Sequence, residues 1–324
     1  MRETHEMLPR KDGGQVFVRT WHPDASPRAV MLVLHGMQEH GGRYGGLARA
    51  LEPLGLVVVV PDHRGHGRSV SRPEALGVLG SEGHEGVIRD IELLMDLCRS
   101  RYPGLPLVLL GHSWGSFLAQ AVAQRRGGDL AGLVLSGTNG RNPLVLPGVL
   151  LARLVCAFRG ADRPADLLET LSMGHFNRAF EPGPMGKEWL SRDPEEVRAY
   201  VQDPACGFKC PNSFFLEMVR LLYRTWRPTA EARMPRHLPV LFLTGTEDPV
   251  SEKGRGVRVL IDRWRRGGME DLSARWYAGA RHEVFHEIDR EQVFEDLRQW
   301  LRDRVLHAGP EGGPPGSGDS GSVA

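Results

Sequence analysis

Apolar residues along the chain are concentrated in short, β-branched runs separated by segments with helical spacing. Five runs are almost fully apolar: Ala29–Leu34, Leu56–Val60, Leu107–Leu110, Leu130–Leu135 and Val240–Leu243. Runs of this length without polar alternation are typical of parallel strands that are buried on both faces. Between them, apolar residues recur three or four positions apart, as around Val87 and Ile91. This alternation predicts a doubly wound α/β domain with a mostly parallel central sheet and helices on both faces.

The alternation stops between residues 141 and 236. This stretch has no convincing strand but shows helical patterns at Leu146–Phe158, Glu188–Val201 and Ser213–Tyr223. It is too long to be a plain connection in a compact domain. We therefore predict a helical cap, residues 141–236, inserted into a core formed by residues 1–140 and 237–307. The cap is expected over the carboxyl edge of the sheet, where α/β folds bind ligands.

The composition of the chain limits which partners it can attract and indicates its cellular compartment. The 324 residues include 41 Lys and Arg against 40 Asp and Glu, so the chain has no general field that attracts nucleic acid or an anionic membrane. Four cysteines are too few for a disulfide framework, which favours a reducing, cytoplasmic location. The mixed charges of the amino terminus do not fit a secretory signal. Residues 308–324, rich in Gly and Pro, are predicted to be disordered.

A serine framed by glycines follows the third apolar run. The segment Gly111-His112-Ser113-Trp114-Gly115 fits the pattern G-x-S-x-G, with a strand pattern before it and a helical pattern directly after it. The bare pattern is common, and this context makes it specific for a nucleophile elbow, a tight turn that presents the serine hydroxyl above the sheet. The glycines are needed because side chains there would clash. We predict that Ser113 is a nucleophile.

A serine hydroxyl attacks only when a positioned base removes its proton. In this type of fold, the acid and the histidine follow the serine in chain order. Asp248 lies just past the last of the five apolar runs, and His282 lies beyond a further run, Ser273–Tyr277. We expect His282 to be the base and Asp248 to hold its tautomer and stabilise the imidazolium. Glu247 and His286 are the competing candidates.

The same chemistry needs two backbone N–H groups to stabilise the developing oxyanion. One is expected from Trp114, and the other from the loop after the first apolar run. In that loop, Gly36 lets the backbone approach the substrate, and Met37 is the predicted second donor. His35 and His40 could suggest a metal pair, but their spacing is not H-x-x-x-H and nothing nearby completes a zinc site. We predict neither a metal nor a cofactor.

Several motifs together carry a resemblance to a known family. They are His35-Gly36…Glu39-His40…Arg43-Tyr44, the run Asp62–Ser69, the elbow at Ser113, Thr244-Gly245…Asp248 and Arg281-His282-Glu283. With them the chain resembles the monoacylglycerol lipase/lysophospholipase group of α/β-hydrolases over residues 15–306, most weakly in the cap. The resemblance implies the α/β-hydrolase fold and action without a cofactor on glycerol esters, lysophospholipids and related acyl esters. It also implies a triad of Ser113, Asp248 and His282 with an oxyanion hole from Met37 and Trp114.

Two positions depart from the pattern of this group. Gln38 stands where members often have glycine, and Trp114-Gly115-Ser116 replaces the more usual Met-Gly-Gly. Both changes preserve the backbone donors, while the indole of Trp114 can alter the shape of the pocket.

The remaining charged and cysteine motifs are interpreted as structural. The run Asp62–Ser69 is expected to satisfy loop backbone groups. Glu39 and Arg43 are expected to form a buried ion pair that braces the oxyanion loop. Cys206 and Cys210 look like half of a metal site, but no second half follows, so free thiols in the cap are expected.

An apolar stripe in the cap has two interpretations. Its members are Leu146, Val149, Leu150, Leu154, Val155 and Phe158. The stripe either packs onto the core or belongs to a lid helix that exposes apolar surface to lipid aggregates or lines an acyl channel.

We therefore expect a serine hydrolase that cleaves carboxylic esters of lipids, of the monoacylglycerol or lysophospholipid type, through an acyl-enzyme. Its partner is a small acyl-ester substrate, with possible peripheral contact of the cap with lipid aggregates. The alternatives are a thioesterase or peptidase on the same triad, or a catalytically silent hydrolase-fold protein that binds a small apolar ligand. The complete triad argues against the silent protein, which has no need of all three residues.

Overall fold

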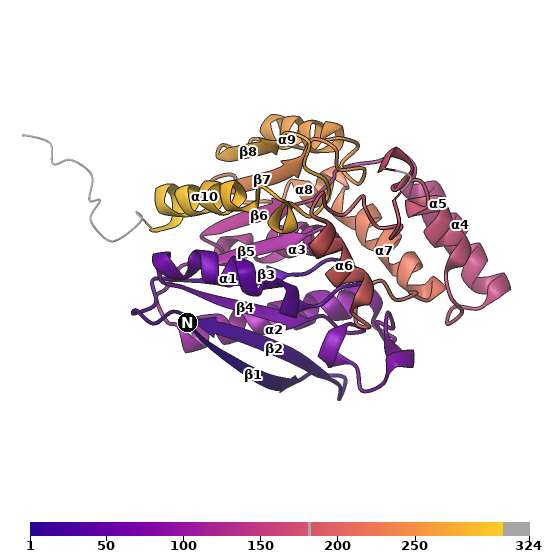
Figure 1. Ribbon diagram of the computed structural model, residues 1–324, viewed down its shortest axis with the longest axis horizontal. Coiled ribbons are helices and arrows are strands. Elements are labelled where there is room, and N and C mark those ends of the chain that lie inside the picture. The colour runs from indigo at the N-terminus through magenta and orange to yellow at the C-terminus, as the bar shows by residue number, and fades with distance from the viewer. Residues whose placement is uncertain (181–182, 307–324) are drawn as a thin grey trace, which may run out of the picture.

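One eight-stranded sheet organises the computed structural model, which describes residues 1–180 and 183–306 (Figure 1). The strand order is β1-β2-β4-β3-β5-β6-β7-β8. The strands are β1 (Arg2–Pro9), β2 (Gln15–His22), β3 (Ala29–Leu34), β4 (Leu56–Asp62), β5 (Leu107–His112), β6 (Gly132–Ser136), β7 (Val240–Gly245) and β8 (Leu272–Tyr277). Strands β3 to β8 are parallel to their neighbours within that set, so the predicted mostly parallel sheet is confirmed. The predicted disordered tail, 308–324, lies outside the described residues.

Helices occur on both faces of the sheet and at one of its ends. They are α1 (Gly45–Leu51), α2 (Gly83–Arg101), α3 (Trp114–Arg126), α4 (Val145–Arg159), α5 (Asp166–Met173), α6 (Pro194–Gln202), α7 (Asn212–Thr225), α8 (Pro228–Glu231), α9 (Arg255–Arg266) and α10 (Arg290–Leu301). No helix of the described residues is long and apolar enough to cross a membrane.

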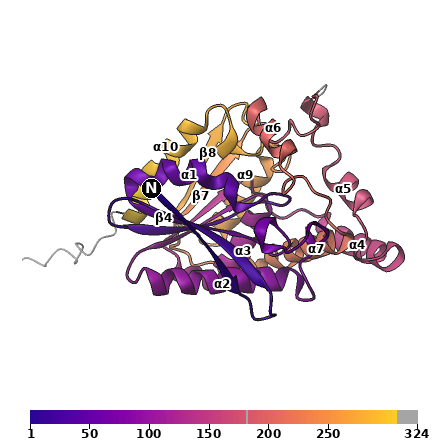
Figure 2. The same cartoon turned by 60° about the horizontal axis from the view of Figure 1, so that its bottom comes forward.

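The central strands are apolar throughout because both of their faces are covered. Alternate residues of a strand point to opposite faces. Met31 and Val58 belong to an apolar cluster that includes residues of α1 and α10, whereas Leu32 and Val59 belong to one that includes residues of α2, α3 and α9. Figure 2 shows α1 and α10 on one side of the sheet and α2 on the other. The resulting double layer fixes the carboxyl ends of the parallel strands, from which the functional loops extend.

The first two strands were not expected from the apolar pattern. β1 pairs with β2 in antiparallel register from Arg2 opposite His22 to Pro9 opposite Gln15, and β2 pairs with β4 in the same sense. Every side chain of β1 is exposed or half-buried. The strand therefore lacks the continuous apolar run by which the other strands were predicted, and it forms an antiparallel edge.

The connection between β6 and β7 contains helices α4 to α8. In its described residues no strand is present beyond an isolated bridge between Pro164 and Pro211. Helices α4, α5 and α7 lie together beyond one end of the sheet (Figure 1), with α4 packed against α7. These helices supply one wall of the cavity described below.

One predicted helix is wrong in its first half. The pattern Glu188–Val201 suggested a continuous helix, but α6 begins only at Pro194. Asp193 accepts a hydrogen bond from the backbone N–H of Glu195, and proline fits the first helical turn, so these two residues define a helix start. The preceding residues instead run alongside the loop after β8, where their carbonyl groups accept hydrogen bonds.

Candidate active site

Ser113 occupies the tight turn between β5 and α3. Its backbone has φ 51° and ψ −122°, a left-handed conformation that is strained for a residue with a side chain. A Cβ atom on Gly111 would collide with the carbonyl oxygen of Gly115, and one on Gly115 would collide with that of Leu34. The first glycine therefore permits the turn itself. The second permits the close approach of the loop after β3, which is a stronger reason for glycine than the turn alone.

Asp248 and His282 meet at the same edge of the sheet. Asp248 follows β7 and His282 follows β8, and Nδ1 of His282 lies 2.9 Å from Oδ1 of Asp248. The backbone N–H of Val250 also donates to Oδ1, at 2.9 Å. Both side chains are buried, at 0% exposure for Asp248 and 2% for His282. Among the described residues, the buried Nε2 of His282 has no hydrogen-bond partner.

Burial and nearby carboxylates act on the pKa of His282 in opposite directions. Burial acts to lower this pKa, but the charge of Asp248, its hydrogen bond, and the charges of Glu283 and Glu39 together raise it by more, so the net shift is upward. The ring of His112 lies 4.8 Å from the ring of His282. Burial lowers the pKa of His112 to about 4, so this neighbouring ring is neutral at pH 7. Asp248 is therefore the charged group that directly contacts His282.

The two competing candidates lie elsewhere. Glu247, next to Asp248, points to the exposed amine of Lys253 at 2.7 Å. His286 places Nδ1 3.2 Å from a carboxylate oxygen of Glu196 on α6. The structure therefore brings Asp248, and not Glu247, to the ring of His282.

His35 orients the loop after β3, a role that the sequence did not suggest. The Gly36 carbonyl accepts a hydrogen bond from Nδ1 of His35 at 2.7 Å, and Nε2 of the same ring accepts one from the N–H of His63 at 3.0 Å. Only the neutral tautomer with its proton on Nδ1 satisfies both contacts. Since the C=O and N–H of a trans peptide point in opposite directions, this contact turns the N–H of Met37 away from His35.

A buried ion-pair network stabilises the loop after β3. Arg43 contacts Glu39 at 2.7 Å and Glu283 through two hydrogen bonds of 2.7 Å. Glu39 also accepts hydrogen bonds from the N–H of Gly36 at 2.5 Å and from the hydroxyl of Tyr44 at 2.9 Å. Burial acts to raise the pKa values of both carboxyl groups, but the charge of Arg43 lowers them below their usual range. The expected pair of Glu39 and Arg43 thus exists, and it includes a third residue, Glu283.

A cavity of about 230 Å³, partly open to the outside, lies next to these groups. Ser113, Trp114, Met37 and His282 all line it. The rest of its wall is mostly apolar and comes largely from the segment between β6 and β7, including Val145, Met173, Phe176, Met218, Leu222 and Trp226. Within residues 1–180 and 183–306, no acceptor pairs with the backbone N–H of Met37 or of Trp114. The arrangement can accommodate an apolar chain and a carbonyl oxygen together.

The residues before α6 also contact the loop that carries His282. The Trp189 carbonyl accepts a hydrogen bond from the N–H of His282 at 3.3 Å, and the Leu190 carbonyl accepts one from the N–H of Glu283 at 2.8 Å. The indole of Trp189 lies 5.1 Å from the imidazole of His282. The segment between β6 and β7 therefore both encloses the cavity and supports this histidine.

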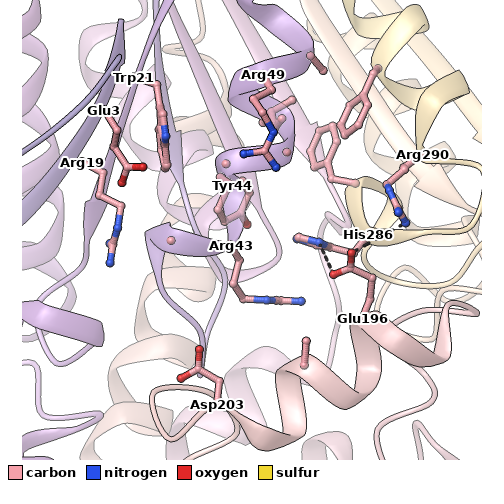
Figure 3. A pocket seen from close by; sticks show the side chains of 18 of the residues that line it. Glu3, Arg19, Trp21, Arg43, Tyr44, Arg49, Glu196, Asp203, His286 and Arg290 are labelled. Atoms are coloured by element: carbon pink, nitrogen blue, oxygen red, sulfur yellow. Dashed lines mark hydrogen bonds and ion pairs between the residues drawn. The ribbon is translucent and has the colours of Figure 1, made fainter. Parts of the chain in front are cut away.

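A second, larger hollow of about 740 Å³ lies outside this cavity (Figure 3). Its lining is mainly polar, and Figure 3 shows His286 and Arg290 on one side, near Glu196, with Arg43 toward the centre. Neither Ser113 nor His282 lines it. This hollow therefore lies apart from the serine and histidine despite its greater size.

The run Asp62–Ser69 satisfies loop groups, as expected. Asp62 accepts hydrogen bonds from the N–H groups of Gly41 and Arg68 and from the guanidinium of Arg19. Arg64 forms a two-fold hydrogen bond with Asp90 on α2.

Cys206 and Cys210 are free, buried thiols. The sulfur of Cys206 lies near ring or carboxylate atoms of His40 and Asp203 in a group that could hold a metal ion. However, Nδ1 of His40 accepts a hydrogen bond from the N–H of Gly42, so the neutral ring carries its proton on Nε2, which faces Asp203 at 2.9 Å. The nitrogen that faces the group is thus a donor, which does not suit a metal ligand.

Residues 25–289 match the family described as serine aminopeptidase, S33. The match covers most of the chain, so the protein belongs to this family of hydrolases.

Individual relatives refine this class. Human monoglyceride lipase is 32% identical over 313 residues, which cover 95% of this chain and 93% of that protein. Monoacylglycerol lipase of Mycolicibacterium smegmatis is 31% identical over 293 residues, covering 89% and 93%. These relatives confirm the resemblance that the motifs indicated, and they identify the chain as a carboxylic ester hydrolase.

A solved structure of a related enzyme has the same fold. A thermostable carboxyl esterase from Bacillus coagulans, in complex with glycerol, superimposes with a TM-score of 0.87 at 26% identity, covering 94% of this chain and 99% of that one. The predicted α/β-hydrolase fold is thereby confirmed.

Proposed function

We propose that the protein hydrolyses single-chain acyl esters of glycerol or of lysophospholipids, with Ser113 as nucleophile, His282 as general base and Asp248 as the group that orients His282. The contact of 2.9 Å between Asp248 Oδ1 and His282 Nδ1 carries this proposal. It leaves the second ring nitrogen of His282, without another partner among the described residues, beside the cavity that Ser113 lines. A base held in this way is what a serine hydroxyl requires.

In the acylation step, Oγ of Ser113 attacks the ester carbonyl carbon while Nε2 of His282 accepts the hydroxyl proton. The carbonyl oxygen becomes an oxyanion that accepts hydrogen bonds from the N–H groups of Met37 and Trp114. Collapse of this intermediate breaks the bond to the alcohol. The leaving alkoxide takes the proton from His282, and the acyl group stays on Ser113.

In the deacylation step, water replaces the alcohol. His282 accepts a proton from the water as its oxygen attacks the acyl carbonyl, and the same two N–H groups stabilise the second oxyanion. The proton then returns from His282 to Oγ of Ser113, and the fatty acid leaves. Both steps use only this chain's own residues and water, so the proposal requires no cofactor.

The choice of substrate rests on the cavity and on the relatives. The cavity wall is mostly apolar, so each methylene buried there contributes about 0.8 kcal/mol. The relatives named as monoglyceride and monoacylglycerol lipases support a single acyl chain on glycerol. A triacylglycerol should be a poor substrate because its other two chains must fit under the same helices.

We further propose that residues 141–236 act as a cap whose helix α4 contacts lipid aggregates. The apolar stripe of α4 divides between the two interpretations given above. Val149 and Val155 are buried, whereas Leu150 is 55% and Phe158 84% exposed. Exposed apolar side chains on one helix favour binding at a lipid–water interface.

All four cysteines are free, which supports a reducing, cytoplasmic location for the protein.

A peptide bond is the second candidate target because the family description names an aminopeptidase. Such an enzyme needs a carboxylate to bind the free amino group of its substrate. Among the described residues, the carboxylates that line the cavity are Glu39 and Glu283, and both are paired with Arg43. The ester is therefore the stronger candidate.

Labelling with a fluorophosphonate tests the proposal. The reagent should modify the wild-type protein at Ser113, and Ser113→Ala should lose both labelling and ester hydrolysis. Ser172→Ala is the matched control, since Ser172 lines the same cavity but donates its hydroxyl to the Leu168 carbonyl at 2.7 Å. Undiminished labelling and hydrolysis in Ser113→Ala would contradict the proposal.

A further inference from the structure

We propose that the cap segment 203–208, named here the cap clamp, holds the loop after β3 in its working position. This loop, residues 35–40, is named here the oxyanion loop, and Gln38 is the positioning residue through which the clamp acts. This inference rests on the proposed function in one respect, namely that the N–H of Met37 is an oxyanion donor. It adds a dependence of the core on the cap that the proposed triad does not require. The geometry of the oxyanion hole, in the core, depends on a segment of the cap.

Gln38 needs an external support. Its backbone has φ 59°, in the left-handed region that residues with a side chain rarely adopt. It follows Met37 directly, so a change in its backbone alters the position of the proposed donor. Strained backbone of this kind persists only where the surroundings hold it in place.

The cap clamp supplies that support through two hydrogen bonds to Gln38. The side-chain Nε2 of Gln38 donates to the carbonyl oxygen of Phe208 at 2.6 Å, and the N–H of Gly207 donates to the carbonyl oxygen of Gln38 at 2.9 Å. Gln38 is only 3% exposed, so water does not readily replace these partners. The residue is thus fixed by two atoms of the cap that lie about 170 positions later in the chain.

A third contact fixes the other end of the clamp. Nε2 of His40 lies 2.9 Å from Oδ2 of Asp203, which Figure 3 shows at the cap side of the polar hollow. The other oxygen of Asp203 accepts a hydrogen bond from the N–H of Ala205 at 2.8 Å, and its carbonyl accepts one from the N–H of Cys206 at 2.9 Å. Asp203 therefore folds the clamp into a turn and ties that turn to the oxyanion loop.

The clamp also reaches the surroundings of the second proposed donor. The ring of Phe208 lies 5.4 Å from the ring of His66, in an edge-on arrangement, and His66 stacks on the indole of Trp114 at 5.3 Å. The cap clamp thus contacts Gln38 directly and reaches Trp114 through the ring of His66.

These contacts predict how catalysis depends on the cap. Met37 lies between Gly36, which the core holds through His35 and Glu39, and Gln38, which the cap holds. Loss of the clamp should therefore weaken stabilisation of the oxyanion while leaving binding of the uncharged substrate unchanged. The effect should fall on kcat rather than on KM, because the oxyanion exists only after attack.

Gln38→Gly is the direct test, since glycine adopts the left-handed backbone without strain but lacks the side-chain donor. With a short soluble p-nitrophenyl ester, kcat should fall about tenfold, less than the effect of deleting a donor outright. Two inhibitors distinguish a loss of oxyanion stabilisation from a general loss of ligand binding. An alkyl trifluoromethyl ketone, which forms a tetrahedral oxyanion, should bind about tenfold more weakly, whereas a monoalkylglycerol ether, which has no carbonyl, should bind as to the wild type.

Two further variants serve as controls. Gln38→Asn also tolerates the left-handed backbone but is too short to keep the same contact, so it should reproduce Gln38→Gly. Glu217→Gln removes a different link between cap and core, the 2.5 Å contact of Glu217 on α7 with His84 on α2, and should leave the ratio of the two affinities unchanged. Melting temperatures near that of the wild type identify variants that are folded.

Three results would overturn the inference. They are an unchanged affinity for the ketone in Gln38→Gly, an equal loss for the ether and the ketone, or the same selective loss in Glu217→Gln. Failure of the proposed function is a different result, because it would appear in the wild-type protein as absence of fluorophosphonate labelling at Ser113. The ketone and ether affinities of the variants can therefore contradict the inference even when fluorophosphonate labels Ser113 in the wild type.

Discussion

The loops at the carboxyl edge of the sheet and the helices of the proposed cap are built differently. The loops after β3, β5 and β7 are anchored on fully buried strands, whereas β8 is only partly buried. The polar groups of these loops and of the loop after β8 form short contacts such as that between Asp248 and His282. Helix α4 of the cap instead leaves Leu150 and Phe158 exposed. We infer that the loops carry the chemistry and that the cap selects and admits the acyl chain.

This division has a measurable consequence. Changes in the loops should alter the rate for every ester, short or long, whereas changes on the outer face of α4 should alter only the response to long chains and lipid aggregates. Gln38 is the exception, because it belongs to a loop but is held by the cap.

The largest effect is expected at the acid of the triad. Asp248→Asn should retain the fold yet lower kcat about 10⁴-fold for all esters, because the amide favours the wrong tautomer of His282. Glu247→Gln is the matched control and should change kcat little, since Glu247 is partnered by Lys253 on the surface. Steady-state kinetics on a soluble ester distinguishes them, and a more damaging Glu247→Gln would mean that the acid is misassigned.

The next largest effect concerns the length of the acyl chain. Each methylene that enters the apolar cavity should raise kcat/KM about fourfold, which corresponds to about 0.8 kcal/mol, until the cavity is filled. A series of p-nitrophenyl esters from acetate upward measures this slope. A maximum at acetate would show that the cavity does not bind the acyl chain, and would refute the lipid-ester proposal without affecting the triad.

The pH dependence should follow the ionisation of His282. The base must be neutral to accept a proton, and Asp248 raises the pKa of His282 above 6.5. The value of kcat/KM should therefore fall about tenfold for each pH unit well below that pKa, with the midpoint of the acidic limb above pH 6.5. A midpoint below 6.5 in the wild-type protein would contradict the strong coupling of His282 to Asp248.

The smallest effect is expected on the outer face of α4. Replacing Leu154 and Phe158 together by serine should raise the apparent KM several-fold on monoacylglycerol vesicles, because less apolar area contacts the lipid. The rate on a soluble short-chain ester should not change. Leu93→Ser, at a partly exposed leucine of α2, is the control and should have no effect on either substrate. Equal losses on soluble and aggregated substrates would contradict an interfacial role for α4.

Most of the sheet could be predicted because burial on both faces leaves a strong local signal. The runs that became β3 to β7 are apolar at nearly every position, so they need no knowledge of their neighbours. β1 left no such signal, since an edge strand owes its conformation to pairing with β2 rather than to its own apolar residues. The apolar periodicity of Glu188–Val201 begins before α6, whereas the start of α6 is marked by Asp193 and Pro194 and not by that periodicity.

The residues of the candidate site could be proposed from the sequence for a different reason. Chain order and position at strand ends constrain the serine, the acid and the histidine, so a few local motifs suffice to propose them. Contacts between residues far apart leave no such trace. Arg43 meets Glu283, 240 positions away, and Gln38 meets Phe208 at a distance of 170 positions. Such pairings follow only from the three-dimensional arrangement of core and cap.

The central claim is that Ser113 carries the acyl group of a monoacylglycerol during the reaction. Rapid mixing with a monoacylglycerol, acid quenching within milliseconds and mass spectrometry of the digested protein test it most directly. We expect a mass increase of one acyl group, with loss of water, on the peptide that contains Ser113, and none in Ser113→Ala. An acyl group found on another residue while the wild type turns over substrate, or monoacylglycerol hydrolysis that persists in Ser113→Ala, would contradict the account.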